Sequence, residues 1–151
     1  ARRTTTVMTD NIQPVLTAGD IIDLQRIVRE VPVSDHVPRY TLSLLRPTRF
    51  REPELPDFIS AQLNWGAAPR AVQFLILGGK PRALPQGRPH GPCEDTQALA
   101  KAVLRHRLVL SFTAESEGIT ADDIVERLLE ITPTREDELT RDARFQKIFA
   151  S

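Results

Sequence analysis

The stretch Gly66-Ala67-Ala68-Pro69-Arg70-Ala71 decides our prediction of the fold and function of this 151-residue chain. Pro69 suits the first position of a helix, because the N–H that proline lacks has no partner there and its φ is already helical. Arg70 then lies in the opening turn, beside unpaired backbone N–H groups at the positive end of the helix dipole. A guanidinium beside such a helix start suits a phosphate group. Gly66 permits a tight turn or the close approach of a partner.

The residues after this stretch predict a helix that is apolar over much of its circumference, and therefore central and largely buried. Gly78-Gly79 should weaken the end of this helix, and Pro81 should terminate it. The flanking segments 46–65 and 81–93 are rich in proline, and we expect both to be loops. Trp65 is expected to anchor the first loop against the helices. The apolar positions of the helix are Val72, Phe74, Leu75, Ile76 and Leu77.

Four further patterns predict helices elsewhere in the chain. Thr17-Ala18-Gly19-Asp20 resembles a capping box before an apolar periodic segment. Ser34 is expected to cap the next helix, which Pro47 should stop or kink. Two more helices are expected, from about Glu94 to His106 and from Thr120 onward. The apolar faces of the first, second and last of these four helices comprise Ile21, Leu24, Ile27, Val28 and Val31; Val37, Tyr40, Leu44 and Leu45; and Ile124, Leu128 and Leu129.

These elements predict an all-α fold, a helical bundle of about four to five helices with long Pro-rich loops. Residues 1–16 are expected to be an irregular lead-in, residues 17–132 the helical domain and residues 133–151 a tail that fits a last helix. The apolar run 108–110 is too short to predict a strand.

The composition limits the class of protein. Lys+Arg and Asp+Glu both number 20, so the formal net charge is zero and predicts no general attraction to nucleic acid or acidic membranes. The single cysteine, Cys93, has no internal disulfide partner, which favours an intracellular protein. The sequence contains no apolar run long enough to span a bilayer and no signal peptide.

Several short segments, in this order along the chain, resemble the C-terminal lid of the MoxR family of AAA+ ATPases. The resemblance covers roughly the first 130 residues, and its strength lies in the order of several weak motifs. Because the chain starts at Ala1 inside a family pattern, we expect an excised fragment of a longer polypeptide. The matching segments are Arg2-Arg3-Thr4-Thr5, Val28 to Asp35, Gly66 to Ala71 with Ala68 in place of the family's serine, Glu94-Asp95, Val103 to Leu108 and Glu117 to Asp123.

The resemblance implies that Arg70 is the sensor-2 arginine, which reaches the γ-phosphate of ATP from the lid. Pro69 and Gly66 would lie beside the same nucleotide. It further implies ATP with Mg²⁺ in the full-length protein, bound between this lid and an N-terminal ATPase core. The protein would form a homo-oligomeric ring, hexameric in related proteins, with a chaperone-like role in the cytoplasm and a von Willebrand A domain protein as partner. Ala68 removes the usual N-cap hydroxyl, at a cost of about 1 kcal/mol to the helix.

Two other patterns were considered as sites. Gly78-Gly79-Lys80-Pro81 lacks the first glycine and the final hydroxyl of a Walker A motif, so it predicts a helix end. Without that motif the fragment alone is not expected to hydrolyse ATP. His90 and Cys93 have the spacing of two metal ligands, but a structural zinc site needs four, so we expect no metal.

The alternative function is a helical adaptor or nucleic-acid-binding module. It would use the basic residues Arg46, Arg49 and Arg51 together with the turn Arg105–Arg107. Such a module would bind nucleic acid with an affinity that falls steeply with salt, whereas an isolated lid should bind neither DNA nor ATP strongly. The neutral total charge makes nucleic acid the less favoured partner. A free-standing enzyme ranks last, because no nucleophile–base pair or metal cluster is evident.

Overall fold

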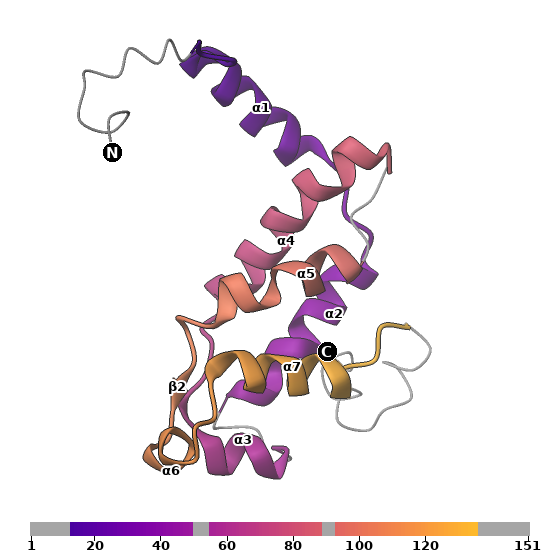
Figure 1. The fold of residues 1–151 in the computed structure, drawn as a ribbon. Helices are drawn as coiled ribbons and strands as arrows, with labels where there is room; N and C mark the ends of the chain where they lie inside the picture. Colours follow the sequence, from indigo (N-terminus) through magenta and orange to yellow (C-terminus); the bar gives the residue numbers. More distant parts are fainter. Residues whose placement is uncertain (1–12, 50–54, 89–92, 136–151) are drawn as a thin grey trace, which may run out of the picture. The chain divides into compact units, whose positions relative to one another are not determined.

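The structure is a computed structural model that describes residues 13–49, 55–88 and 93–135. The chain divides into two compact units, residues 1–30 and residues 31–151. The described residues form seven α-helices and one two-stranded sheet, and the predicted all-α class is confirmed (Figure 1). None of the helices in these parts of the chain has the length and apolar character needed to cross a bilayer. The predicted last helix of the tail lies outside the described residues.

The first unit contains helix α1 (Ala18–Glu30). Its predicted capping box is present, because the Thr17 N–H donates to Asp20 Oδ2 at 2.7 Å and the Asp20 N–H donates to Thr17 Oγ1 at 3.2 Å. The side-chain hydrogen bond from Thr17, followed by its backbone bond, lowers the pKa of Asp20. Taken by itself, this helix leaves Ile21, Leu24 and Ile27 about half exposed.

The second unit packs four longer helices around one apolar core. These are α2 (His36–Leu45), α4 (Arg70–Ala83), α5 (Cys93–Leu104) and α7 (Ala121–Ile131). Helix α4 packs against both α2 and α5, and α5 packs in turn against α7. Fully buried side chains of the core include Leu44, Ile59, Leu75, Leu104, Ile124 and Leu128.

Helix α2 buries the predicted apolar stripe, but its start differs from the prediction. The N-cap is Asp35, which makes no side-chain cap hydrogen bond, so the expected cap at Ser34 is wrong. The Ser34 carbonyl instead accepts the Val37 N–H at 3.1 Å. At the other end α2 gives way to the 3₁₀ turn η2 (Arg46–Thr48), which contains Pro47, as predicted.

Helix α4 is longer and less buried than the sequence predicts. It continues through Gly78-Gly79 and Pro81 to Ala83, so the predicted termination at Pro81 is wrong. The glycines permit close packing, because a Cβ on Gly78 would lie 2.9 Å from Leu99 Cδ1 of α5. Helix packing there outweighs the poor propensity of the segment. Only every fourth residue is buried: Ala71, Leu75, Gly79 and Ala83.

Both predicted Pro-rich loops contain regular structure. Segment 46–65 holds helix α3 (Asp57–Gln62) and strand β1 (Leu63–Trp65), and segment 81–93 holds the end of α4 and the 3₁₀ turn η3 (Leu84–Gln86). Strand β1 pairs antiparallel with β2 (Val109–Leu110), with Leu63 opposite Leu110. The short helix α6 (Phe112–Ser116) follows β2.

Trp65 does not anchor this region, because its side chain is 70% exposed. Ile59 of α3 and Leu63 of β1 are buried in the core instead. The predicted anchoring role of Trp65 is therefore wrong.

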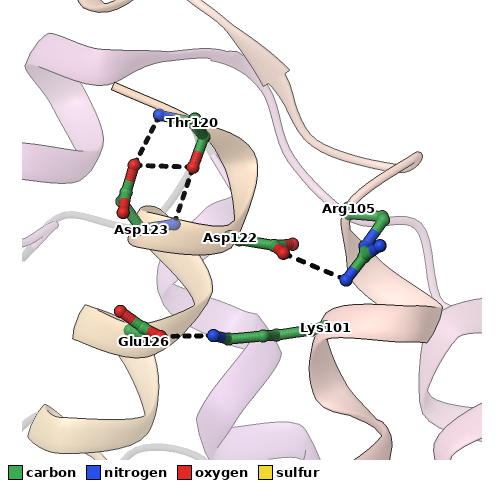
Figure 2. A network of polar contacts seen from close by, with 6 residues as sticks. All are labelled: Lys101, Arg105, Thr120, Asp122, Asp123 and Glu126. Carbon is green, nitrogen blue, oxygen red and sulfur yellow. Dashed lines mark hydrogen bonds and ion pairs between the residues drawn. The ribbon is translucent and has the colours of Figure 1, made fainter. Parts of the chain in front are cut away.

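The contact between α5 and α7 carries charged pairs on its surface (Figure 2). Lys101 pairs with Glu126, and Arg105 Nη2 lies 3.0 Å from Asp122 Oδ2. Helix α7 starts where predicted and has a capping box, in which the Thr120 N–H donates to Asp123 Oδ2 at 2.7 Å. These contacts hold the start of α7 beside the C-terminal end of α5. The chain that leaves α5 at this end continues to β2.

Candidate functional site

The start of α4 lies where the sequence predicts it. Pro69 has helical φ and ψ of −53° and −28°, and the helix proper is assigned from Arg70. In the first turn, the Ala71 N–H donates to the Ala68 carbonyl at 2.9 Å, and the Val72 N–H donates to the Pro69 carbonyl at 3.1 Å. No side chain caps this helix, in line with the alanine at position 68.

Arg70 is exposed at this helix start. Among the residues that the structure describes, none forms a hydrogen bond or ion pair with its side chain. The first turn of α4 also contains no acidic residue. Arg70 contributes to an open groove of about 510 Å³, whose other lining residues are Trp65, Gly66, Ala68, Gln73, Phe74 and Arg107.

A second guanidinium lines the same groove. The Arg107 guanidinium carbon lies 5.1 Å from the ring centroid of Phe74, which is a cation–π distance. Its Nη1 also donates to the Val103 carbonyl at the end of α5. Sequence reasoning did not assign Arg107 to the site of Arg70, although it belongs to the motif Val103 to Leu108. The motif marked the segment that contains Arg107, but the spacing of Arg70 and Arg107 along the chain does not show that they share a groove.

The loop before α4 is held by a residue that sequence reasoning missed. Thr48, in η2, is fully buried, and its Oγ1 accepts the Ala67 N–H at 3.1 Å. The same hydroxyl donates to the Leu45 carbonyl at 2.7 Å. The close approach anticipated at Gly66 is to Thr48, because a Cβ on Gly66 would lie 1.8 Å from the Thr48 carbonyl oxygen.

A smaller groove of about 290 Å³ lies next to the same loop. It is apolar on the side of α2 and α4 and has two arginines from the end of α2 and the residues after it. Ala68 lines both grooves, so this loop borders each of them. The lining residues are Leu42, Leu45, Arg46, Arg49, Ala67, Ala68, Pro69 and Val72.

The opposite end of α4 is held by a buried carboxylate, which the sequence did not predict. The Asp95 side chain is 5% exposed and accepts from Arg88 Nη2 at 3.1 and 3.2 Å. Arg82 Nε lies 3.4 Å from Asp95 Oδ1. Two arginines from the end of α4 and the segment after it therefore share one carboxylate of α5.

The remaining candidates were a His–Cys pair and a glycine-rich segment. Cys93 is buried with Val37 and Tyr40, and burial raises the pKa of its thiol to about 11. His90 lies outside the described residues. Within residues 13–49, 55–88 and 93–135, no group of three or more His, Cys, Asp or Glu side chains could hold a metal ion. The segment Gly78-Gly79-Lys80 lies inside α4 and forms no phosphate loop.

The described basic residues of the alternative function line two different grooves or pair with an acidic residue. Arg105 is paired with Asp122, and Arg107 lies over Phe74. Arg46 and Arg49 line the smaller groove, and Arg51 lies outside the described residues.

Comparison with known proteins assigns the fold to a class. The sequence profile of the AAA lid domain family matches residues 58–128, so this part of the chain forms an AAA lid domain. The crystal structure of a protein described as a "putative ATPase" from Cytophaga hutchinsonii superimposes with a TM-score of 0.79 at 25% identity. That alignment covers 89% of this chain and 41% of the other protein.

Two curated relatives specify the family further. The chain is 29% identical over 116 residues to chaperone MoxR1 from Mycobacterium tuberculosis, covering 77% of this chain and 31% of MoxR1. It is 32% identical over 120 residues to YeaC, an uncharacterized protein from Bacillus subtilis, covering 80% of this chain and 35% of YeaC. The predicted resemblance to the lid of MoxR-type AAA+ ATPases is confirmed, because residues 58–128 match the AAA lid domain family and the chain is similar to a relative named as a MoxR chaperone and to an ATPase structure. The chain spans about a third of the length of these curated relatives.

Proposed function

We propose that this lid presents Arg70 to the γ-phosphate of ATP bound between the lid and an ATPase core, as a sensor-2 arginine. The observation that carries the proposal is an exposed arginine at the first residue of a 14-residue helix, without a polar partner in the described part of the chain. An unpaired guanidinium in a groove can bind a phosphate oxygen without first giving up another contact.

The electrostatics of α4 support an anionic ligand. A cation in the first turn of a helix lies at the positive end of the dipole, which costs about 0.3–1 kcal/mol when no anion is present. The first turn of α4 holds Arg70 and no acidic residue to offset this cost. A phosphate group placed there would satisfy the guanidinium and the free N–H groups together. Arg107, in the same groove, would add a second cation, and Pro69 and Gly66 would lie beside the nucleotide.

The triphosphate of ATP fits the groove at the start of α4, because Arg70 and Arg107 offer it two guanidinium groups. The Mg²⁺ that accompanies ATP would be held by carboxylates of the core. The lid residues bind and orient the terminal phosphate and do not activate the attacking water.

The contact with Arg70 would couple the nucleotide state to lid position. ATP offers a γ-phosphate to Arg70 and ADP does not, so the two nucleotides differ in their affinity for the closed lid. Hydrolysis would thus favour a different lid position relative to the core. We further propose that this movement acts in a homo-oligomeric, hexameric ring in the cytoplasm, with a chaperone-like role and a von Willebrand A domain partner. The family resemblance supports this part, and the name of the relative, chaperone MoxR1, supports the chaperone-like role alone.

The test is ATP turnover by the longer polypeptide that joins this lid to its ATPase core. Arg70→Ala should reduce turnover at saturating ATP about 100-fold, by analogy with the loss of one transition-state donor. Arg26→Ala is the matched control, because it removes an exposed arginine of α1 whose pair with Asp23 lies at the surface. Thermal unfolding of the Arg70→Ala variant should be unchanged. Full turnover by this variant would remove Arg70 from the mechanism.

A further inference from the structure

We propose that Thr48 is a positioning residue, which fixes the backbone of residues 66–69 and thereby determines where Arg70 meets the nucleotide. The proposal rests on the function proposed above for Arg70. Thr48 lines neither of the two grooves, and it lies 22 positions before Arg70 in the sequence.

The Thr48 hydroxyl joins two elements. Its Oγ1 donates to the carbonyl of Leu45, the last residue of α2, at 2.7 Å. It also accepts the N–H of Ala67, in the loop before α4, at 3.1 Å. Thr48 is fully buried and Ala67 is 3% exposed, so water cannot readily replace these bonds. One hydroxyl therefore ties the start of the arginine-bearing helix to the end of α2.

Gly66 makes a second contact with the same residue. A Cβ built on Gly66 would lie 1.8 Å from the carbonyl oxygen and 2.5 Å from the carbonyl carbon of Thr48. Only a glycine permits this approach. Gly66 thus contacts the backbone of Thr48, and Ala67 contacts its side chain. Together the two contacts fix the position of the loop relative to Thr48.

The local sequence around Thr48 explains how it reaches the loop. Pro47 has no backbone N–H, so α2 ends and the chain continues as the 3₁₀ turn η2. The Arg49 N–H closes this turn on the Arg46 carbonyl at 3.0 Å. Thr48 then follows Leu45 by three residues, which is the spacing at which a threonine hydroxyl returns to the backbone. The turn directs Thr48 into the interior of the lid.

Only two residues separate Ala67 from Arg70, and their conformation is restricted. Pro69 has a fixed φ, and the Ala68 and Pro69 carbonyls accept the N–H groups of Ala71 and Val72 in the first turn of the helix. A displacement at residues 66–67 would therefore be passed to Arg70 with little loss. A misplacement of about 1 Å at a group that orients a substrate can reduce a rate about 100-fold.

The experiment compares Thr48→Val with Thr48→Ser in the polypeptide that contains both lid and core. Valine keeps the shape of threonine and removes the hydroxyl, whereas serine keeps both hydrogen bonds. We expect turnover at saturating ATP to fall about tenfold in Thr48→Val and to stay within about twofold of wild type in Thr48→Ser.

Combining these changes with Arg70→Ala separates positioning from a general effect on the fold. If Thr48 acts through Arg70, Thr48→Val should lower turnover no further when Arg70 is already alanine. A Thr48 that only stabilised the lid would leave turnover per folded molecule unchanged in Thr48→Val or lower it by the same factor in both backgrounds, and either result would overturn the proposal. The proposed function fails separately, through full turnover of Arg70→Ala alone.

Folding of the variants is followed by thermal unfolding, and turnover is expressed per folded molecule. Should Thr48→Val not fold, Thr48→Cys provides a milder change, because a thiol is a weak donor and acceptor. It should give a loss between those of serine and valine, again absent in the Arg70→Ala background. Wild-type turnover per folded molecule in Thr48→Cys would contradict the positioning role.

Discussion

The N-terminal end of helix α4 is held by uncharged contacts, whereas its C-terminal end is held by ion pairs between two partly exposed arginines and one buried carboxylate. At the first end, the Thr48 hydroxyl and the close approach of Gly66 fix the backbone, and Arg70 keeps an unpaired side chain within the described structure. At the second end, Arg82 and Arg88 are both bound to Asp95.

This difference shows how a helix can be fixed without neutralising its functional charge. A carboxylate beside Arg70 would compete with an anionic ligand for the guanidinium. Neutral hydrogen bonds to the backbone avoid this competition, because they fix the position of the helix start and leave the charge available. At the C-terminal end no ligand is needed, and the basic residues there complement both Asp95 and the negative end of the helix dipole.

Breaking the C-terminal cluster should have the largest effect on stability. Asp95→Asn removes the buried charge that accepts hydrogen bonds from Arg82 and Arg88, and should lower the free energy of unfolding by about 3 kcal/mol. Denaturant unfolding of the 151-residue chain measures this loss. Asp23→Asn, in the exposed pair with Arg26, is the control and should cost less than about 0.5 kcal/mol. Equal losses in the two variants would show that the cluster is no stronger than a surface pair.

The sequence predicted best those elements whose signals are local. The capping box at Thr17 and the spacing of apolar side chains indicated α1, α2 and α7, although the predicted cap of α2 was wrong. The helix predicted from about Glu94 to His106 lies close to the observed α5. The start of α4 followed from Pro69, whose backbone conformation is fixed by its own ring. In each case, residues within four positions of one another decide the structure.

The elements that were missed depend on contacts between distant residues. Strands β1 and β2 exist because Leu63 pairs with Leu110, and the Ser111 N–H donates to the Gln62 carbonyl at 2.9 Å. Helix α4 continues past Pro81 and packs along α5, where Gly78 closely approaches Leu99. Trp65 was misplaced because large apolar residues are not always buried.

The same limit applies to the candidate site. Arg70 could be proposed from its own neighbours in the sequence, whereas its supports could not. The contact between Thr48 and Ala67 spans 19 residues, and the shared groove of Arg70 and Arg107 joins residues 37 positions apart, as the residue numbers show. Such contacts become visible only when the helices are packed.

Two glycines of α4 and its preceding loop offer a sharper test of how the ends differ. Gly66→Ala should lower the free energy of unfolding by about 2 kcal/mol, because its Cβ would overlap the Thr48 backbone. Gly79→Ala should raise it by about 0.5–1 kcal/mol, since its Cβ would meet Asp95 Cβ at 3.7 Å, an ordinary contact inside a helix. Denaturant unfolding of both variants decides the matter. Destabilisation by Gly79→Ala would mean that the C-terminal end is packed as tightly as the N-terminal end.

The last comparison is between the capped start of α7 and the uncapped start of α4. Helix α7, unlike α4, has a full capping box, and Thr120→Ala should cost about 1 kcal/mol near pH 7. Hydrogen bonds from the Thr120 side chain and then its backbone lower the pKa of Asp123.

Because this pKa is lower in the folded chain than in the unfolded one, the stabilisation is fully present above the ordinary carboxyl pKa of about 3.9. It is lost as the pH falls through the lowered value. Wild type should therefore be more stable than Asp123→Asn at pH 7, and the difference should shrink below about pH 4. Denaturant unfolding at several pH values follows this change, and a difference that stayed constant under acid would show that the Asp123 charge adds nothing to the cap. Helix α4 has no such group at its start, so its first turn lacks this acid-sensitive contribution and remains open to an external anion.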